Sequence, residues 1–108
     1  MVVDEEEQRI IYLQEIYILL NAMKLYAHEN NLKKVKEYKN KMGKLEGNIF
    51  TTKMESGSLN YYFDGARNGY QNSVSTAFDE SDRKAYLKAG DEFFYVFEKK
   101  LKKAKIID

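Results

Sequence analysis

The chain has 108 residues and a mass of 12.7 kDa, which leaves room for one domain with a single modest hydrophobic core. It contains no cysteine, so disulfide bridges and thiolate metal sites are excluded. Lys and Arg number 18 and Asp and Glu 17, and the resulting net charge of +1 argues against a dedicated nucleic-acid binder.

The N-terminal region does not read as a targeting segment. Residues 1–7 contain four acids, which is the wrong sign for the start of a secretory signal peptide. The apolar run over residues 10–27 is too polar for a bilayer span, because it is interrupted by Gln14, Glu15, Asn21 and Lys24. We therefore expect a cytoplasmic protein without membrane contact; if it is exported, the route does not use an ordinary signal peptide.

Helical periodicity dominates the first half of the chain. Apolar residues recur at three- and four-residue spacing over about residues 4–29, and the same spacing resumes over residues 32–45. A continuous or kinked helix is slightly favoured, although Asn31 could instead cap a new helix that starts at Leu32. Further apolar residues lie off the periodic face, so the first segment is apolar nearly all round: Ile11, Tyr12, Ile18 and Leu19.

The middle of the chain differs in composition. Residues 48–52 and 59–63 are rich in β-branched and aromatic side chains and flank a short polar segment with Gly57. A short β-hairpin at 48–63 is therefore one alternative. A long connection whose aromatic side chains dock on the helices is favoured over it.

The second half, about residues 65–106, again has helical period and ends in lysines that suit the negative end of a helix dipole. The acids Asp79, Glu80 and Asp82 lack the ligand spacing of a calcium loop, so we interpret them as a solvated face or a helix cap. The sequence predicts an all-α fold, either an antiparallel long helical hairpin or a small helical bundle. The alternative is a four-helix up-down bundle.

A hairpin that turns between Gly47 and Gly65 would place side by side residues whose numbers sum to about 111. Two segments that are apolar all round, 10–20 and 93–97, would then meet at one end, and two helices cannot bury all of that surface. Exposed apolar patches of this size mark interaction sites. We therefore predict that a protein partner binds through Ile10, Tyr12, Leu13, Tyr17, Leu20, Phe93, Phe94 and Phe97.

Residues that could carry chemistry are few. His28 is the only histidine, and we interpret it as a surface residue near a helix bend. Six lysines over residues 33–44 could form a phosphate-binding strip, but an ordinary lysine-rich outer face is the favoured interpretation. The chain has no phosphate-cradling glycine loop and no nucleophile motif, so we expect no enzyme, no catalytic residue, no metal site and no cofactor.

One local pattern stands out, the segment FDGARNGY at 63–70. It resembles the turn of the small Trp-x-Gly helical-hairpin proteins of type VII secretion, in which an aromatic residue, any residue and a glycine join two long helices. The resemblance implies that Phe63 and Gly65 form the turn, and that the chain is an export partner of a larger protein. Phe63 stands where that family has tryptophan. The family's tyrosine followed four residues later by an acid is missing, and Phe94 with Glu98 is the nearest approximation.

Together these features predict a non-enzymatic helical protein–protein interaction module. It would act as a homodimer or as the partner of a larger protein. The alternative is an immunity protein or a phage-encoded inhibitor that binds and blocks an enzyme or effector.

Overall fold

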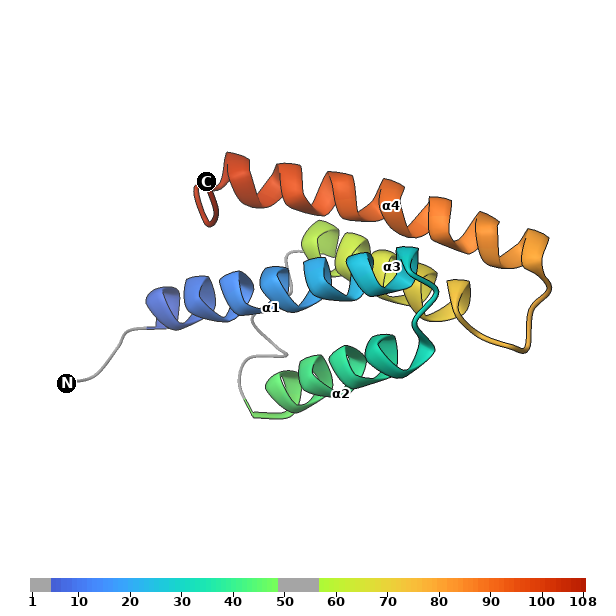
Figure 1. Cartoon of the computed structure of the whole chain (residues 1–108). Coiled ribbons are helices and arrows are strands. Elements are labelled where there is room, and N and C mark those ends of the chain that lie inside the picture. The colour runs from blue at the N-terminus through green and yellow to red at the C-terminus, as the bar shows by residue number, and fades with distance from the viewer. Residues whose placement is uncertain (1–4, 49–56) are drawn as a thin grey trace.

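The structure is a computed structural model that describes residues 5–48 and 57–108. It is an up-down bundle of four helices, and no strand occurs among the described residues (Figure 1). The helices are α1 (Glu5–His28), α2 (Leu32–Asn48), α3 (Gly57–Ser73) and α4 (Glu80–Lys103). The predicted all-α class is confirmed, in its four-helix form.

The helices pack as two hairpins. α1 packs most closely on α2 and α3 on α4, while α1 also contacts α3 and α4. In Figure 1, α4 lies along the upper edge and α2 along the lower edge, with α1 and α3 between them. The expected pairing of α1 with α4 occurs, since the rings of Tyr17 and Phe94 stack with centroids 5.8 Å apart. The long two-helix hairpin is wrong, however, because each of its arms is divided into two helices.

The slightly favoured continuous helix through residues 29–31 is also wrong, for a local reason. Asn30 adopts a left-handed φ of 55°, and the backbone N–H of Asn31 donates to the carbonyl of Tyr26 at 2.9 Å. This is the hydrogen bond that closes a helix end. The Asn31 side chain accepts from the N–H of Lys34 at 3.1 Å, so Asn31 caps the next helix as the alternative predicted.

Local hydrogen bonds also define the two ends of α4. Asp79 caps the helix by accepting from the N–H of Asp82 at 2.8 Å, which confirms the cap interpretation of the acidic cluster. At the other end, Lys105 has a φ of 60°, and the N–H of Ile106 donates to the carbonyl of Leu101 at 2.9 Å. Ile106 is thereby turned back into the core.

The described part of the region around 48–63 does not fit the alternative β-hairpin, nor the favoured long connection, because its second half is helical. Residues 59–63 lie within α3, and residues 49–56 fall outside the described part of the chain. Leu59, Phe63, Ala66 and Tyr70 are all buried. Their spacing of four, three and four residues places them on one helical face. The helical period therefore prevailed over the β-rich composition of this segment.

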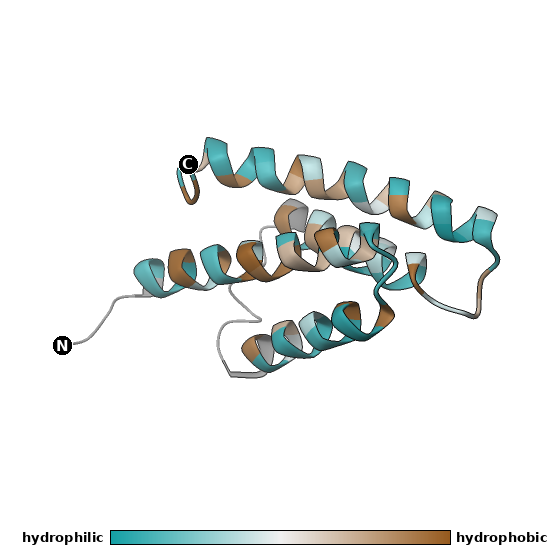
Figure 2. Cartoon of the chain, viewed as in Figure 1, coloured by the Kyte–Doolittle hydropathy of each residue, from teal (hydrophilic) through white to brown (hydrophobic). Residues whose placement is uncertain are grey.

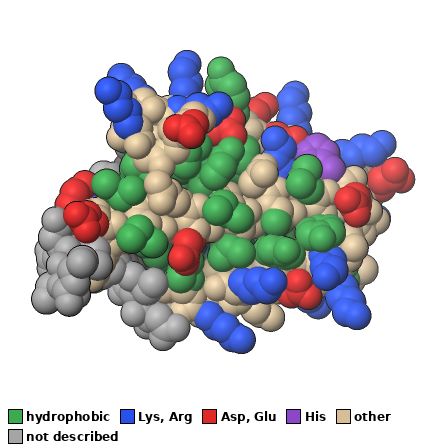
Figure 3. Space-filling view, turned by 60° about the vertical axis from the view of Figure 1, so that its left-hand side comes forward, with side chains coloured by type: hydrophobic (Ala, Val, Ile, Leu, Met, Phe, Trp, Pro, Cys, Tyr) green, Lys and Arg blue, Asp and Glu red, His purple; other side chains and the backbone are tan. Residues whose placement is uncertain are grey.

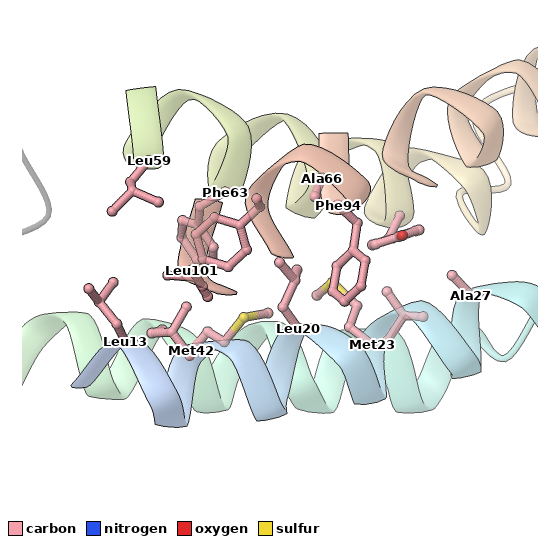
Figure 4. Packing of buried hydrophobic residues seen from close by; sticks show 14 of the residues in the cluster. Leu13, Leu20, Met23, Ala27, Met42, Leu59, Phe63, Ala66, Phe94 and Leu101 are labelled. Carbon is pink, nitrogen blue, oxygen red and sulfur yellow. The ribbon is translucent and has the colours of Figure 1, made fainter. Parts of the chain in front are cut away.

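The core is built from all four helices, and Figure 4 shows side chains from them converging between the ribbons. Its fully enclosed side chains come from all four helices: Tyr12, Leu13, Ile16, Leu20, Met23, Val35, Met42, Phe63, Ala66, Tyr70, Phe97 and Leu101. On α3 the small side chain of Ala66 stands between the rings of Phe63 and Tyr70.

Glycines bring α3 and α4 unusually close. A Cβ atom at Gly69 would lie 2.7 Å from the Cα of Gly90, and one at Gly90 would lie 2.9 Å from the ring of Tyr70. Side chains other than hydrogen cannot fit there. The two helix backbones therefore touch at these glycines.

Phe63 and Gly65 do not form the expected turn, because both lie inside α3. A Cβ atom at Gly65 would lie 2.6 Å from the ring of Phe93, so this glycine makes room for that ring. Phe63 packs against Phe97 with ring centroids 5.9 Å apart. Both residues shape the contact between α3 and α4.

Candidate functional site

Most of the predicted partner-binding residues are enclosed within the single chain. Tyr12, Leu13, Leu20, Phe94 and Phe97 are 2% exposed or less. The remaining members, Ile10, Tyr17 and Phe93, are partly buried against the same core. The expectation of one large exposed apolar patch built from these eight residues is therefore wrong.

The reason is visible in the aromatic run of α4. Phe93 lies on Gly65 of α3, Phe94 lies between Tyr17 of α1 and Tyr70 of α3, and Phe97 packs on Phe63. A helix in a four-helix bundle buries two sides rather than one stripe, so consecutive aromatic residues can all find neighbours. Of this run, Tyr95 is the large side chain that stays exposed, at 62%.

A different set of apolar residues remains open to solvent on α1. Ile11, Ile18 and Leu25 are exposed by 49%, 64% and 57%. They are spaced by seven residues, and at 100° per residue seven residues fall within about 20° of two full turns. The three side chains therefore form one straight row, which we call the α1 stripe.

The α1 stripe lies on the side of α1 that faces away from the bundle. The buried residues Leu13, Ile16, Leu20 and Met23 occupy the opposite side of the helix. In Figure 2, hydrophobic segments recur along the whole of α1. This helix therefore carries apolar residues both toward the core and toward solvent.

One face of the molecule combines apolar and charged side chains. Figure 3 shows hydrophobic side chains gathered across the middle of this face, with basic and acidic side chains along its margins. On α4, Lys99 lies over the ring of Tyr95 at 5.9 Å, and Lys102 lies 4.0 Å from Glu98. An apolar centre with a charged rim is the usual composition of a protein interface.

A polar cluster joins three of the helices elsewhere. The Tyr70 hydroxyl donates to Asp91 Oδ1 at 2.7 Å, and His28 Nε2 lies 2.8 Å from Asp91 Oδ2. Burial raises the pKa of Tyr70 well above its ordinary value, and the hydrogen bond to Asp91 raises it further. The hydroxyl therefore keeps its proton at neutral pH and acts as a fixed donor that ties α3 to α4.

A second contact of this kind joins α1 to α4. The Tyr17 hydroxyl donates to Glu98 Oε2, and burial together with this hydrogen bond raises the pKa of Tyr17 to about 12. Gln14 Nε2 also donates to the carbonyl of Ile106, at 2.9 Å. The inner flank of α1 is thus anchored to α4, which fixes the direction in which the α1 stripe points.

Metal ligation and membrane crossing can both be assessed for residues 5–48 and 57–108. Among the described residues, no three His, Asp or Glu side chains lie close enough together to hold a metal ion. Within the same part of the chain, none of the helices combines the length and the apolar character that crossing a bilayer requires.

The sequence contained part of the signal for the α1 stripe. Ile11 and Ile18 were recognisable as apolar residues off the buried face, and their seven-residue spacing extends to Leu25. Periodicity alone could not show that α2 and α4 flank α1 without covering its outer side.

Comparison with known proteins identified no relative of this chain. No protein-family model matches the chain, and no curated protein or solved structure matches it at the level that would indicate a relationship.

Proposed function

We propose that this protein is a non-enzymatic helical binding module, and that the α1 stripe docks against a helix of another protein molecule. The observation that carries the proposal is the exposure of Ile11, Ile18 and Leu25 in one row at seven-residue spacing. A seven-residue apolar repeat is the pattern by which one helix packs along another. The partner is a second copy of this chain or a larger protein.

The energetics favour covering this row. Full burial of an isoleucine or leucine side chain is worth about 1.5–3 kcal/mol. Because the three residues are already about half buried, covering the rest would contribute on the order of 3–5 kcal/mol in total. A micromolar complex needs about 8 kcal/mol. The partner must therefore also contact neighbouring residues of α1, such as Gln14 and Asn21.

Ile18 is the residue to change, because it is central in the row and the most exposed of the three. Ile18→Glu places a charge where the partner helix would pack and leaves the buried side of α1 untouched. Tyr61→Glu is the matched control, since Tyr61 is 60% exposed but belongs to α3. Helicity should be the same in both variants and in the wild type.

The experiment has two stages. Sedimentation over a range of concentrations tests for self-association, which Ile18→Glu should weaken and Tyr61→Glu should not. If the wild type stays monomeric, it serves as bait in an extract of its native host. A protein retained by the wild type and by Tyr61→Glu, but lost with Ile18→Glu, is then expected. The proposal would be contradicted if the wild type is a monomer and every protein that it retains is retained equally by Ile18→Glu.

The export-partner role implied by the type VII resemblance stays a prediction. Such a role requires that a second protein pack along the helices, so the Ile18→Glu variant tests that requirement as well. The inhibitor alternative predicts a monomer that binds one enzyme or effector, and the bait experiment would reveal it.

A further inference from the structure

A groove between α2 and α3 forms a second surface, separate from the outward side of α1. It consists of two adjoining hollows of about 220 and 690 Å³, whose linings share Lys39 and Gln71. The smaller hollow has an apolar floor that includes Leu32, Val35 and Val74. Ligand sites in proteins commonly measure about 300–1,000 Å³, so the groove is large enough for one.

The charged side chains that line the groove are all of one sign, positive, within the described part of the chain. Of the described residues, four cations line it and no carboxylate does: Lys36, Lys39, Lys44 and Arg67. Arg67 is partly neutralised by Asp64 at 2.9 Å, but no ion pair to the three lysines occurs within the described residues. The groove therefore carries a positive field that favours an anionic ligand.

The lysine-rich strip of α2 is thus divided between two sides of the helix. On the other side, Lys34 and Lys41 each lie 3.6 Å from Glu37, which offsets one of their two charges. Lys41 also lies over the ring of Tyr38, at 4.5 Å. Among the described residues, the three lysines on the groove side have no ion pair, and Lys33, which lies outside the groove lining, has none either.

Amide side chains indicate what kind of anion fits. Asn40, Asn68, Gln71 and Asn72 line the groove together with the cations. Each amide offers both donors and an acceptor, which matches the alternating N–H and C=O groups of a peptide backbone. A phosphodiester offers acceptors alone, and the described lining of the two hollows contains no aromatic residue on which a base could stack. The lining therefore fits an acidic peptide better than a nucleic acid.

Gly43 supplies an independent observation. Gly65, Gly69 and Gly90 each face atoms within 3.0 Å of where a Cβ would stand, but at Gly43 nothing lies within 4 Å. Glycine inside a helix is unfavourable, and no contact within the described chain accounts for it here. Gly43 lines the larger hollow, where its missing side chain keeps the groove open.

We infer that the α2–α3 groove binds an extended acidic peptide segment of a partner protein. The lysines would pair with its carboxylates, the amides would hydrogen-bond its backbone, and the apolar floor would take one of its hydrophobic side chains. Lys36 and Lys44 are separated by roughly 12 Å along α2, which about four extended residues span.

The test uses three fluorescent probes and the full-length protein. The first is a peptide of about eight residues in which glutamate alternates with valine. The second has glutamine in place of glutamate, and the third is a single-stranded oligonucleotide with the same net charge as the first. Anisotropy titrations at about 150 mM salt suppress long-range attraction. The acidic peptide should bind at least about tenfold tighter than either of the other probes.

Matched variants locate the binding. The double change Lys36→Gln with Lys39→Gln should weaken binding about tenfold, whereas Lys34→Gln with Lys41→Gln, which removes the same charge from the other side of α2, should change it less than about threefold. Gly43→Leu should also weaken binding, because its side chain would project into the larger hollow. Its helicity and melting temperature should not fall.

Three results would overturn the inference. The first is failure of the acidic peptide to bind at millimolar concentration. The second is an oligonucleotide that binds as tightly as the peptide, which would point to a general polyanion surface. The third is equal weakening by the two double variants.

Discussion

The hydroxyl groups of Tyr17 and Tyr70 are donors held in place by carboxylates of α4, Glu98 and Asp91. Burial is the larger cause of the raised pKa of both tyrosines, and the carboxylate partner adds to it. In the unfolded chain both would titrate near their ordinary value of about 10. The folded protein therefore holds these two protons more tightly than the unfolded chain does.

This difference predicts how stability depends on pH. A group whose pKa is raised on folding contributes stability that is fully present below its unfolded pKa and is lost as pH rises through its folded pKa. For Tyr17 that window runs from the ordinary value of 10.0 to about 12. The free energy of unfolding, measured by urea titration at increasing pH, should decline across this window. The decline should be shallower in Tyr17→Phe. Equal slopes for the wild type and Tyr17→Phe would contradict the assignment.

Gly43 gives a second prediction at the scale of one residue. Because a Cβ there meets nothing within 4 Å, Gly43→Ala should raise the free energy of unfolding by about 0.5–1 kcal/mol through helix propensity. Urea titration at neutral pH measures it. A loss of stability would mean that this position does not have the open space that the peptide groove requires.

At the scale of the helices, the tight contact between α3 and α4 depends on glycine. A Cβ at Gly69 would stand 2.7 Å from the backbone of Gly90 and 2.8 Å from the carbonyl oxygen of Tyr86. Backbone cannot move aside as the end of a flexible side chain can, so the two helices would have to separate. Helix α4 would then lose part of its packing on both α3 and α1.

Gly69→Ala should therefore destabilise the protein by about 1–3 kcal/mol, the range found for overpacked cores. Gly43→Ala is its control, since the chemical change is the same and the helix setting is similar. Urea unfolding of the two variants side by side measures the contrast. If both changes stabilised the protein, the close approach of α3 and α4 would be refuted.

The helices themselves were largely predictable from the spacing of apolar residues, but the breaks between them were not. At Asn30 and Asn31 the periodic pattern continues across the boundary, while local hydrogen bonds end one helix and cap the next. Each of these effects is worth only about 1 kcal/mol, so a sequence pattern alone cannot rank them. At residues 59–63, aromatic composition suggested strands, although the burial of Leu59 and Phe63 follows a helical period.

At the scale of the whole molecule, the step from two helices to four decides which residues face solvent. In a two-helix hairpin the aromatic run of α4 would have been exposed, whereas in the bundle Phe94 and Phe97 are enclosed. Residues predicted to bind a partner thus became core. The row that stays open, Ile11, Ile18 and Leu25, lies on the side of α1 that the other three helices do not cover.

The bundle presents two different surfaces as a result. The outward side of α1 carries the apolar α1 stripe, and the groove between α2 and α3 is lined mainly by lysines and amides. One would recognise a helix and the other an acidic peptide, so a single partner could engage both or two partners could bind independently. Variants at Ile18 and Lys39 separate these cases, because each disables one surface alone.

The most direct measurement of the central claim is site-specific cross-linking. The chain contains no cysteine, so Ile18→Cys and Tyr61→Cys each give one attachment point for a photo-activated cross-linker. The two positions are similarly exposed, at 64% and 60%, and lie on different helices. If the α1 stripe is a docking surface, position 18 should yield one defined adduct, with a second copy or with a host protein, that position 61 does not yield. Equal, diffuse labelling from both positions would contradict the account.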